Sequence, residues 1–433
     1  MRAVVSFRFW RVVVAGAMLL VATSCSEKPT EGSADVTEIV FWHNQTLTNQ
    51  NALQEIVNRF NALDSKRRVT LEYAGNYSQI YQKIMAAIQA KDLPNIVVSY
   101  ESMVSEYARA NVALPLDEYI SNPQHGLTSA DLADIFPVFL DTNRYVQFGN
   151  RQLSFPFAKS VLMMYDNPSM LEKAGYQNPP WTWDEFIERC RAIKQMTGKQ
   201  AYALSIDPST VDAMIFSLGG NIFTPDGTTP LFDQTPAVKA FEIIETLAKE
   251  KLCYQVTPGG FDDVTDFAFQ RVCFVLRTSA SRPFIQQQVQ DKFRWDMTTI
   301  PQADPAKPVT VLFGPSICIL RSTDAENLVA WQFAKFFTSS EITALWATRT
   351  GYLPVRKSAA EAPIMKSFFA SAPVNRRAFD NLPFARPEPN MIGWQEIRSL
   401  IDKAEGSVIA GKQTGRDAAL WLNKEASRVI AER

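Results

Sequence analysis

The chain has few of the residues that metal-dependent or histidine-dependent catalysis uses. It contains five cysteines and only two histidines, His43 and His125, and no two cysteines stand at a spacing typical of metal ligands. A histidine-based metal site or catalytic triad is therefore poorly supplied, which argues against most classes of hydrolase. Four cysteines have apolar neighbours, as buried thiols do, and the sequence does not decide whether they form disulfides: Cys190, Cys253, Cys273 and Cys318.

The fifth cysteine, Cys25, has the surroundings of a thiol that is acylated after export. A basic start and an apolar run over residues 12–22 precede it, and this run is shorter than the roughly 20 residues that a membrane-spanning helix needs. Residues 1–24 are thus predicted to be a signal peptide and residues 25–36 a polar tether. The small residues Ala22-Thr23-Ser24 before the cysteine resemble a bacterial lipobox. We expect lipid on Cys25 to anchor the exported chain to the bacterial cell membrane, facing the periplasm or the exterior. The alternative is a plain signal peptide in which Cys25 has no role.

Length and charge favour a soluble chain with two lobes. The 433 residues, less signal and tether, leave about 400, which is more than one hydrophobic core normally serves. Lysine plus arginine total 44 and aspartate plus glutamate 45, so the basic field that nucleic-acid binding requires is missing. No segment after the signal is apolar for long enough to cross a membrane. We expect a monomer that binds no nucleic acid, needs no cofactor and meets the membrane only through its N-terminal lipid.

Apolar periodicity predicts alternating strands and helices at the start of the mature chain. The expected elements are a strand at 38–42, a helix at 49–63, a strand at 69–73, a helix at 80–88 and a strand at 96–98. This order is typical of a parallel sheet covered by helices. Ligands of such sheets bind beyond the carboxyl ends of the strands. Tyr77 and Glu101, which follow the second and third strands, are therefore expected at the edge of a cleft.

A second α/β unit is predicted to begin near Tyr145. Thr182 and Glu185 have the spacing of a capping box at the start of a helix, and Thr235-Pro236 has the composition of another helix start. The pattern of helices and short strands again favours an α/β fold.

Seven short segments, which run in the same order along nearly the whole mature chain, resemble those of a known family. They are Phe41-Trp42-His43, Arg59-Phe60-Asn61, Gly75-Asn76-Tyr77, Tyr100-Glu101, Pro156-Phe157, Thr350-Gly351-Tyr352-Leu353-Pro354 and Ile397-Arg398. The family is the extracellular solute-binding proteins (family 1) of ABC importers, which includes maltose-binding proteins. The similarity is greatest to its glycerol-3-phosphate-binding members.

The resemblance implies two α/β lobes, joined by hinge strands, with a ligand cleft between them. It implies that the chain crosses between the lobes more than once. We place lobe one at 37–144 plus 297–328, and lobe two at 145–296 plus 329–433.

The resemblance also implies a ligand pocket built by residues of both lobes. These are Tyr77, Glu101, Ser160, Ser279, Gly314, Tyr352 and Arg398. Arg398 can offer a guanidinium fork to a phosphate, and the serines, the Gly314 N–H and the Tyr352 hydroxyl can complete its shell of donors. Glu101 would be repelled by a phosphate and is expected to accept hydrogen bonds from glycerol hydroxyls. Without the resemblance, Arg398 could form a surface ion pair near Glu396 or Asp402, and Glu101 could cap a helix.

The implied function is capture of glycerol-3-phosphate or a glycerophosphodiester, without catalysis, for delivery to the transmembrane subunits of an ABC permease. Residues 204–207 stand where the glycerol-3-phosphate binder has tryptophans, and loss of this aromatic wall makes room for a larger ligand, such as glycerophosphocholine, or for a sugar. A mono- or oligosaccharide-binding lipoprotein is thus the alternative. Two alternatives from other classes are an adhesive lipoprotein and a surface glycoside hydrolase, which would pair Glu101 with Asp207 or Asp263.

Overall fold

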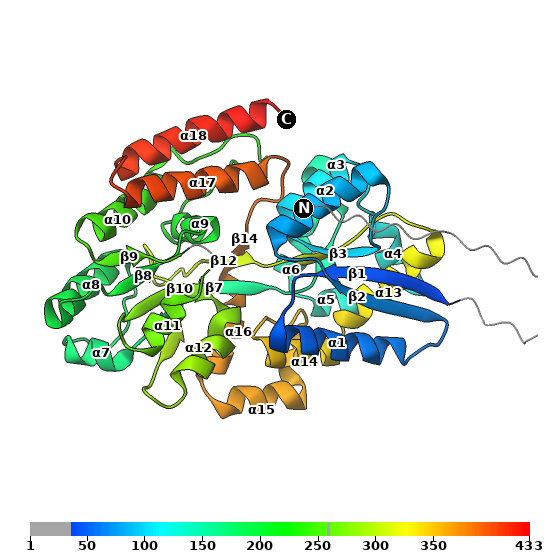
Figure 1. Cartoon of the computed structure of the whole chain (residues 1–433), viewed down its shortest axis with the longest axis horizontal. Coiled ribbons are helices and arrows are strands. Elements are labelled where there is room, and N and C mark those ends of the chain that lie inside the picture. Colours follow the sequence, from blue (N-terminus) through cyan, green and yellow to red (C-terminus); the bar gives the residue numbers. More distant parts are fainter. Residues whose placement is uncertain (1–35, 258–259) are drawn as a thin grey trace, which may run out of the picture.

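The computed structural model describes residues 36–257 and 260–433. Cys25, the predicted signal peptide and nearly all of the predicted tether lie outside the described residues. The described chain forms two α/β lobes, each built around its own sheet (Figure 1). The predicted two-lobed α/β architecture is therefore confirmed.

The first lobe is built on a five-stranded sheet in the order β2-β1-β3-β13-β6. Its strands are β1 (Thr37–His43), β2 (Arg67–Tyr73), β3 (Ile96–Ser99), β6 (Phe155–Pro156) and β13 (Ser316–Ile319). β1 runs parallel to β2 and β3, as the strand-helix-strand pattern predicts, whereas β13 is antiparallel to both β3 and β6. A distant segment of the chain thus completes the sheet that the N-terminal segment starts.

The helices of the first lobe cover both faces of this sheet. They are α1 (Leu47–Asn61), α2 (Tyr77–Ala90), α3 (Glu101–Arg109), α4 (Asp117–Ser121), α5 (Ser129–Asp134), α6 (Pro137–Asp141), α13 (Asp324–Phe337) and α14 (Ser340–Thr350); a small ribbon joins β4 (Arg144–Tyr145) to β5 (Arg151–Gln152). Asn76 and Gln79 form a capping box that starts α2 directly after the β2 loop.

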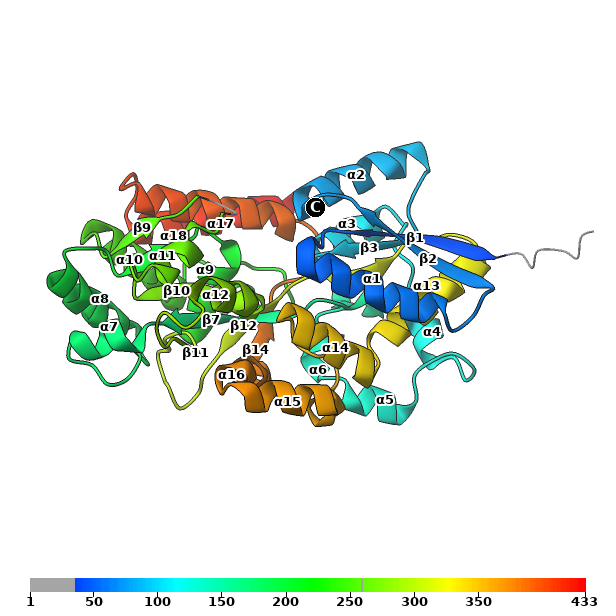
Figure 2. The same ribbon diagram turned by 60° about the horizontal axis from the view of Figure 1, so that its bottom comes forward.

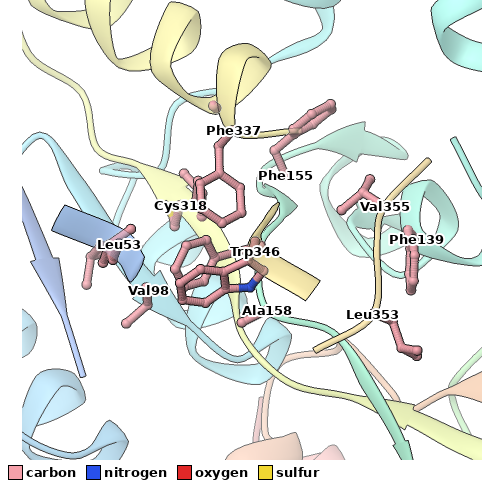
Figure 3. Packing of buried hydrophobic residues seen from close by; sticks show 14 of the residues in the cluster. Leu53, Val98, Phe139, Phe155, Ala158, Cys318, Phe337, Trp346, Leu353 and Val355 are labelled. Carbon is pink, nitrogen blue, oxygen red and sulfur yellow. The ribbon is translucent and has the colours of Figure 1, made fainter. Parts of the chain in front are cut away.

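Aromatic side chains from distant segments form the core of the first lobe. The Phe333 ring of α13 meets the rings of Phe41 and Phe60 edge to face, at 5.7 and 5.3 Å between centroids. Trp346 of α14 lies beside Phe337 (Figure 3), and their ring centroids are 5.5 Å apart. These contacts bury large apolar surfaces and hold α13 and α14 against the N-terminal sheet.

The second lobe is built on a seven-stranded sheet with the main order β14-β12-β7-β10-β8-β9, and β11 pairs with β7. Its strands are β7 (Ser160–Asp166), β8 (Tyr202–Leu204), β9 (Cys253–Gln255), β10 (Phe274–Thr278), β11 (Asp296–Thr298), β12 (Thr310–Phe313) and β14 (Ala385–Pro387). Its helices are α7 (Pro168–Lys173), α8 (Trp183–Thr197), α9 (Pro208–Ser217), α10 (Thr235–Lys249), α11 (Asp262–Ala268), α12 (Arg282–Val289), α17 (Trp394–Ile409) and α18 (Gly415–Ala431). The predicted Thr182 and Glu185 capping box starts α8.

The four internal cysteines are buried free thiols. Burial raises the pKa of Cys190 and Cys273, which holds both thiols in the unreactive protonated form. Across residues 36–257 and 260–433, no helix combines the length and the apolarity needed to cross a membrane.

The chain crosses between the lobes three times. The first crossing joins β6 to β7 and the second joins β12 to β13. The third leaves α14 and passes through α15 (Pro363–Ser371) and α16 (Val374–Asp380) to reach β14. Figure 2 shows α15 and α16 along the junction of the two lobes.

This arrangement differs from the lobe boundaries that we placed from the sequence. The segment 297–313, placed in lobe one, supplies strands that pair with β7 in the second sheet. The segments 145–156 and 329–350, placed in lobe two, belong to lobe one. The first ends in β6, which pairs with β13, and the second forms most of α13 and α14, which pack on the first sheet. The difference has a physical reason: an apolar strand or helix stripe shows that a segment is buried, but not which of two cores buries it.

Candidate ligand-binding site

The candidate site is built from residues at the ends of strands in both lobes. In the first lobe, β1, β2 and β3 are parallel, so their carboxyl ends share one edge. In the second lobe, β12 runs parallel to β14 and β10 parallel to β8, whereas β7 opposes both β10 and β12. The ends of β8, β10, β12 and β14 therefore share an edge with the start of β7. Of the seven pocket residues implied by the resemblance, four follow the end of a strand: Tyr77, Glu101, Ser279 and Gly314. Ser160 begins β7 and Tyr352 lies close to this end of the strand, whereas Arg398 comes from α17.

Three tyrosines line the side of the site that the first lobe supplies. Tyr77 begins α2 and Tyr100 precedes α3, and their ring centroids are 4.5 Å apart. The ring of Tyr352 stacks on Trp346 at 5.8 Å, with 4° between the ring planes. Burial raises the pKa of Tyr77, and the neighbouring Tyr352 and Tyr100 raise it further, so its hydroxyl stays protonated. The three half-buried rings can offer hydroxyl donors and aromatic surface to a ligand.

Ser160, Ser279 and Gly314 meet at the edge of the second sheet. Ser160 faces Phe313 across β7 and β12, and its hydroxyl donates to the Phe313 carbonyl at 3.4 Å. The Ser279 hydroxyl oxygen accepts the Val161 N–H at 3.3 Å, which leaves its own hydrogen free to donate. Gly314 has φ of 109°, and a Cβ there would overlap the carbonyl oxygen of Ala158, so the crossing can be this close only with glycine.

Glu101 forms a buried ion pair with Lys159. The Lys159 side chain is 1% exposed, and its ammonium also donates to the Gly314 carbonyl at 2.7 Å. Ser316 donates to the same Glu101 oxygen, Oε1, at 2.8 Å. The pair thus connects α3 to the first and second crossings, and only Oε2 of Glu101 is left to accept a hydrogen bond from a ligand. Neither the pairing with Lys159 nor that with Ser316 was expected from the sequence.

Arg398 projects from α17 towards Tyr100, with its guanidinium carbon 5.6 Å from the ring centroid. Its Nη1 contacts Glu388 Oε1 and also donates to the Ser209 hydroxyl at 3.2 Å. The side chain is 14% exposed, so the surface ion pair considered from the sequence is wrong. Glu396, one of the partners considered there, instead pairs with Arg433 at 2.9 Å.

Further carboxylates surround Arg398. Asp207 Oδ1 lies 4.0 Å from its Nη2, and Asp212 is completely buried nearby. Burial raises the pKa of Asp212 well above its usual range, and Glu388 raises it further. Burial and Asp207 also raise the pKa of Asp402 to about 6. Sequence reasoning missed Ser209, Asp212 and Glu388, because no spacing along the chain indicates that they meet Arg398.

His43 lies at the carboxyl end of β1 but is 1% exposed. Its Nδ1 accepts the Gln45 N–H at 3.1 Å, and burial lowers the pKa of His43 to about 4. The imidazole is therefore neutral at physiological pH.

Two carboxylates of the hydrolase alternative are held by cations of the protein. Asp263 is fully buried and holds Arg277 at 2.5 Å in the second lobe, while Glu101 is held by Lys159. In the part of the chain that the structure describes, no group of three or more histidine, cysteine, aspartate or glutamate side chains is arranged to hold a metal ion.

Two sheets joined by three crossings, with polar and aromatic residues at their facing edges, define a two-lobed binding protein. Residues 55–373 match the family model of the bacterial extracellular solute-binding proteins, and the chain belongs to this family. The predicted family membership is confirmed. Proteins of this family bind small solutes and deliver them to ABC permeases, and they are not enzymes.

Relatives and solved structures agree with this assignment. The sn-glycerol-3-phosphate-binding periplasmic protein UgpB of Escherichia coli (strain K12) is 23% identical over 403 residues, covering 88% of this chain and 90% of the relative. UgpB from Mycobacterium tuberculosis, solved in complex with glycerophosphocholine, superposes with a TM-score of 0.81 at 21% identity, covering 91% and 98% of the two chains. The cyclic alpha-maltosyl-1,6-maltose binding protein from Arthrobacter globiformis superposes with a TM-score of 0.79 at 20% identity, covering 92% and 100%.

Proposed function

We propose that this chain is the substrate-binding lipoprotein of an ABC importer for a phosphorylated glycerol derivative, either glycerol-3-phosphate or a glycerophosphodiester. The observation that supports the proposal is that strand ends of both lobes carry hydroxyl and backbone donors, while α17 carries one largely buried arginine that points towards Tyr100. Ser279, the Gly314 N–H and Tyr352 can supply the donors and Arg398 the cation. The Ser160 hydroxyl can join them only by releasing the Phe313 carbonyl, to which it donates. A phosphate needs such a shell. Glycerophosphocholine and glycerol-3-phosphate ligands of the related UgpB proteins support this choice.

A saccharide is the second candidate ligand. Arg398 is already paired with Glu388, and the rings of Tyr77, Tyr100 and Tyr352 offer the aromatic surfaces on which sugars pack. Several similar structures are sugar-binding proteins, including the cyclic maltosyl-maltose binder.

A ligand panel separates these candidates. Phosphate esters of glycerol should raise the melting temperature of the purified protein more than maltose does, because a ligand at 100 times its Kd stabilises the folded state by ~2.7 kcal/mol. A ligand that contacts both lobes should also favour their closed arrangement and reduce the radius of gyration in X-ray scattering. Glycerol, which lacks the phosphate, is the control. Stabilisation by maltose alone would transfer the assignment to the saccharide class.

The membrane anchor is proposed from Cys25. Cys25→Ser should abolish incorporation of labelled fatty acid and release the protein from the membrane fraction, because the thiol is the acylated group. The control Ser33→Ala, in the same tether, should remain lipidated and membrane-bound. Ligand affinity should be equal in all three proteins. A Cys25→Ser protein that is still lipidated would contradict the proposed anchor.

A further inference from the structure

Glu388 occupies the position that an anionic ligand would need at Arg398. It follows the last residue of β14, at the same sheet edge as Ser279 and Gly314. Its Oε1 contacts Arg398 Nη1. The guanidinium fork that the sequence assigned to a phosphate is therefore already occupied, in part, by a carboxylate of the protein itself.

Glu388 is held in this place by a second partner. The Ser209 hydroxyl donates to Glu388 Oε1 at 2.9 Å and accepts from Arg398 Nη1 at 3.2 Å. Ser209 comes from the start of α9, whereas Glu388 and Arg398 belong to the third crossing and α17. Because three separate segments form this triangle, the carboxylate cannot leave the arginine without breaking two contacts.

The surroundings make the Arg398 end of the site acidic. Asp207 lies 4.0 Å from Arg398 Nη2 and its side chain is 43% exposed, so it can face a ligand directly. Within the described residues, neither carboxylate oxygen of the fully buried Asp212 has a hydrogen-bond partner. One arginine thus faces two carboxylates, the largely buried Glu388 and the more exposed Asp207, beside the fully buried Asp212, whose raised pKa favours its neutral form. Its single positive charge is already opposed by these two carboxylates, so each additional negative charge of a ligand adds repulsion.

We propose that Glu388 limits the negative charge of the accepted ligand, so that the site takes phosphodiesters and rejects phosphate monoesters. A phosphate monoester carries about −1.5 to −2 charges at neutral pH, whereas a diester has one ionisable oxygen fewer and carries one charge. The additional charge of the monoester would lie beside Glu388 and Asp207, and like charges at contact repel. This inference rests on the proposed function and narrows it to the diester class.

Calorimetry with three esters tests this role of Glu388. The ligands are glycerol-3-phosphate, glycerophosphocholine and glycerophosphoglycerol, a diester without a cation, at about pH 7.5, where the monoester is mostly dianionic. Wild type should bind both diesters at least about tenfold more tightly than the monoester. Glu388→Gln should raise the affinity for the monoester about tenfold relative to the diesters, because it removes one like charge.

Two further variants provide a second test of the charge limit and a control. Asp207→Asn should also raise the affinity for the monoester relative to the diesters, by less than Glu388→Gln does. It tests the charge limit if Glu388→Gln does not fold. Glu396→Gln, which removes a carboxylate of α17 that pairs with Arg433, should leave all three affinities unchanged. If wild type binds the monoester as tightly as the diesters, or the folded variants keep the wild-type ratio, the charge limit is wrong and the proposed function stands. If none of the esters binds any of these proteins and maltose binds wild type, the proposed function fails and the charge limit fails with it.

Discussion

Lys159→Met is expected to lower the free energy of unfolding by about 3–5 kcal/mol, the usual effect of removing one partner of a buried ion pair. Lys159 is 1% exposed and Glu101 is 8% exposed, so the variant leaves a carboxylate buried without its cation. The hydrogen bond from the ammonium to the Gly314 carbonyl is lost as well. Urea unfolding of the two proteins measures the difference.

The control for this prediction is an exposed lysine. Lys307 pairs with Asp304 at 3.9 Å with its side chain 85% exposed, and Lys307→Met should change stability by less than about 1 kcal/mol. The double variant Lys159→Met with Glu101→Gln should recover part of the loss, because no uncompensated charge remains. Equal stability of wild type and Lys159→Met would show that this ion pair does not hold the crossings in place. Since Lys159 joins both crossings to α3, the variant should also have a larger radius of gyration without ligand.

Arg398→Ala should weaken binding of a phosphorylated ligand by at least about 100-fold, because the phosphate loses its only cation in the proposed shell. The change also leaves the Glu388 carboxylate without the cation that it contacts, so the melting temperature should fall. Arg398→Lys should restore binding only in part, since an ammonium cannot make a bidentate contact. Calorimetry with glycerophosphocholine measures the affinities, on samples shown to be folded.

Arg433→Ala provides the matched control. Arg433 pairs with Glu396 at the surface, 29% exposed, and its removal should leave the affinity unchanged. If a neutral disaccharide binds wild type most tightly and Arg398→Ala binds it equally well, the phosphate assignment fails and the saccharide alternative replaces it.

The carboxylates beside Arg398 add to the effect expected of its truncation. Truncation of an arginine that has no partner in the protein would remove only its contact with the ligand. Arg398 instead lies among carboxylates that the protein itself has placed around it, so its removal makes a local charge that is already negative more negative still. Phosphate affinity should therefore fall further in Arg398→Ala than in the double variant Arg398→Ala with Glu388→Gln.

Local patterns in the sequence determined the early elements of the fold. Apolar spacing predicted β1, α1, β2, α2 and β3, and the Thr182 and Glu185 spacing predicted the start of α8. Each of these signals comes from residues a few positions apart, where backbone geometry sets the period. The same reasoning placed Tyr77 and Glu101 after the ends of β2 and β3, because parallel strands end at one edge, and their contact with a ligand remains a prediction. The export signal and Cys25 were also predicted from neighbouring residues alone.

Only the tertiary structure decided which residues face one another across the chain. Glu101 meets Lys159 across 58 positions, and Ser209 meets Arg398 across 189. β12 joins the second sheet and α13 the first, although both are simply apolar in sequence. The spacing of apolar residues predicts which side chains are buried. The charge of a site depends instead on the partners that folding brings together. This is why the sequence predicted Arg398 as a free cation and the structure shows it already paired with Glu388.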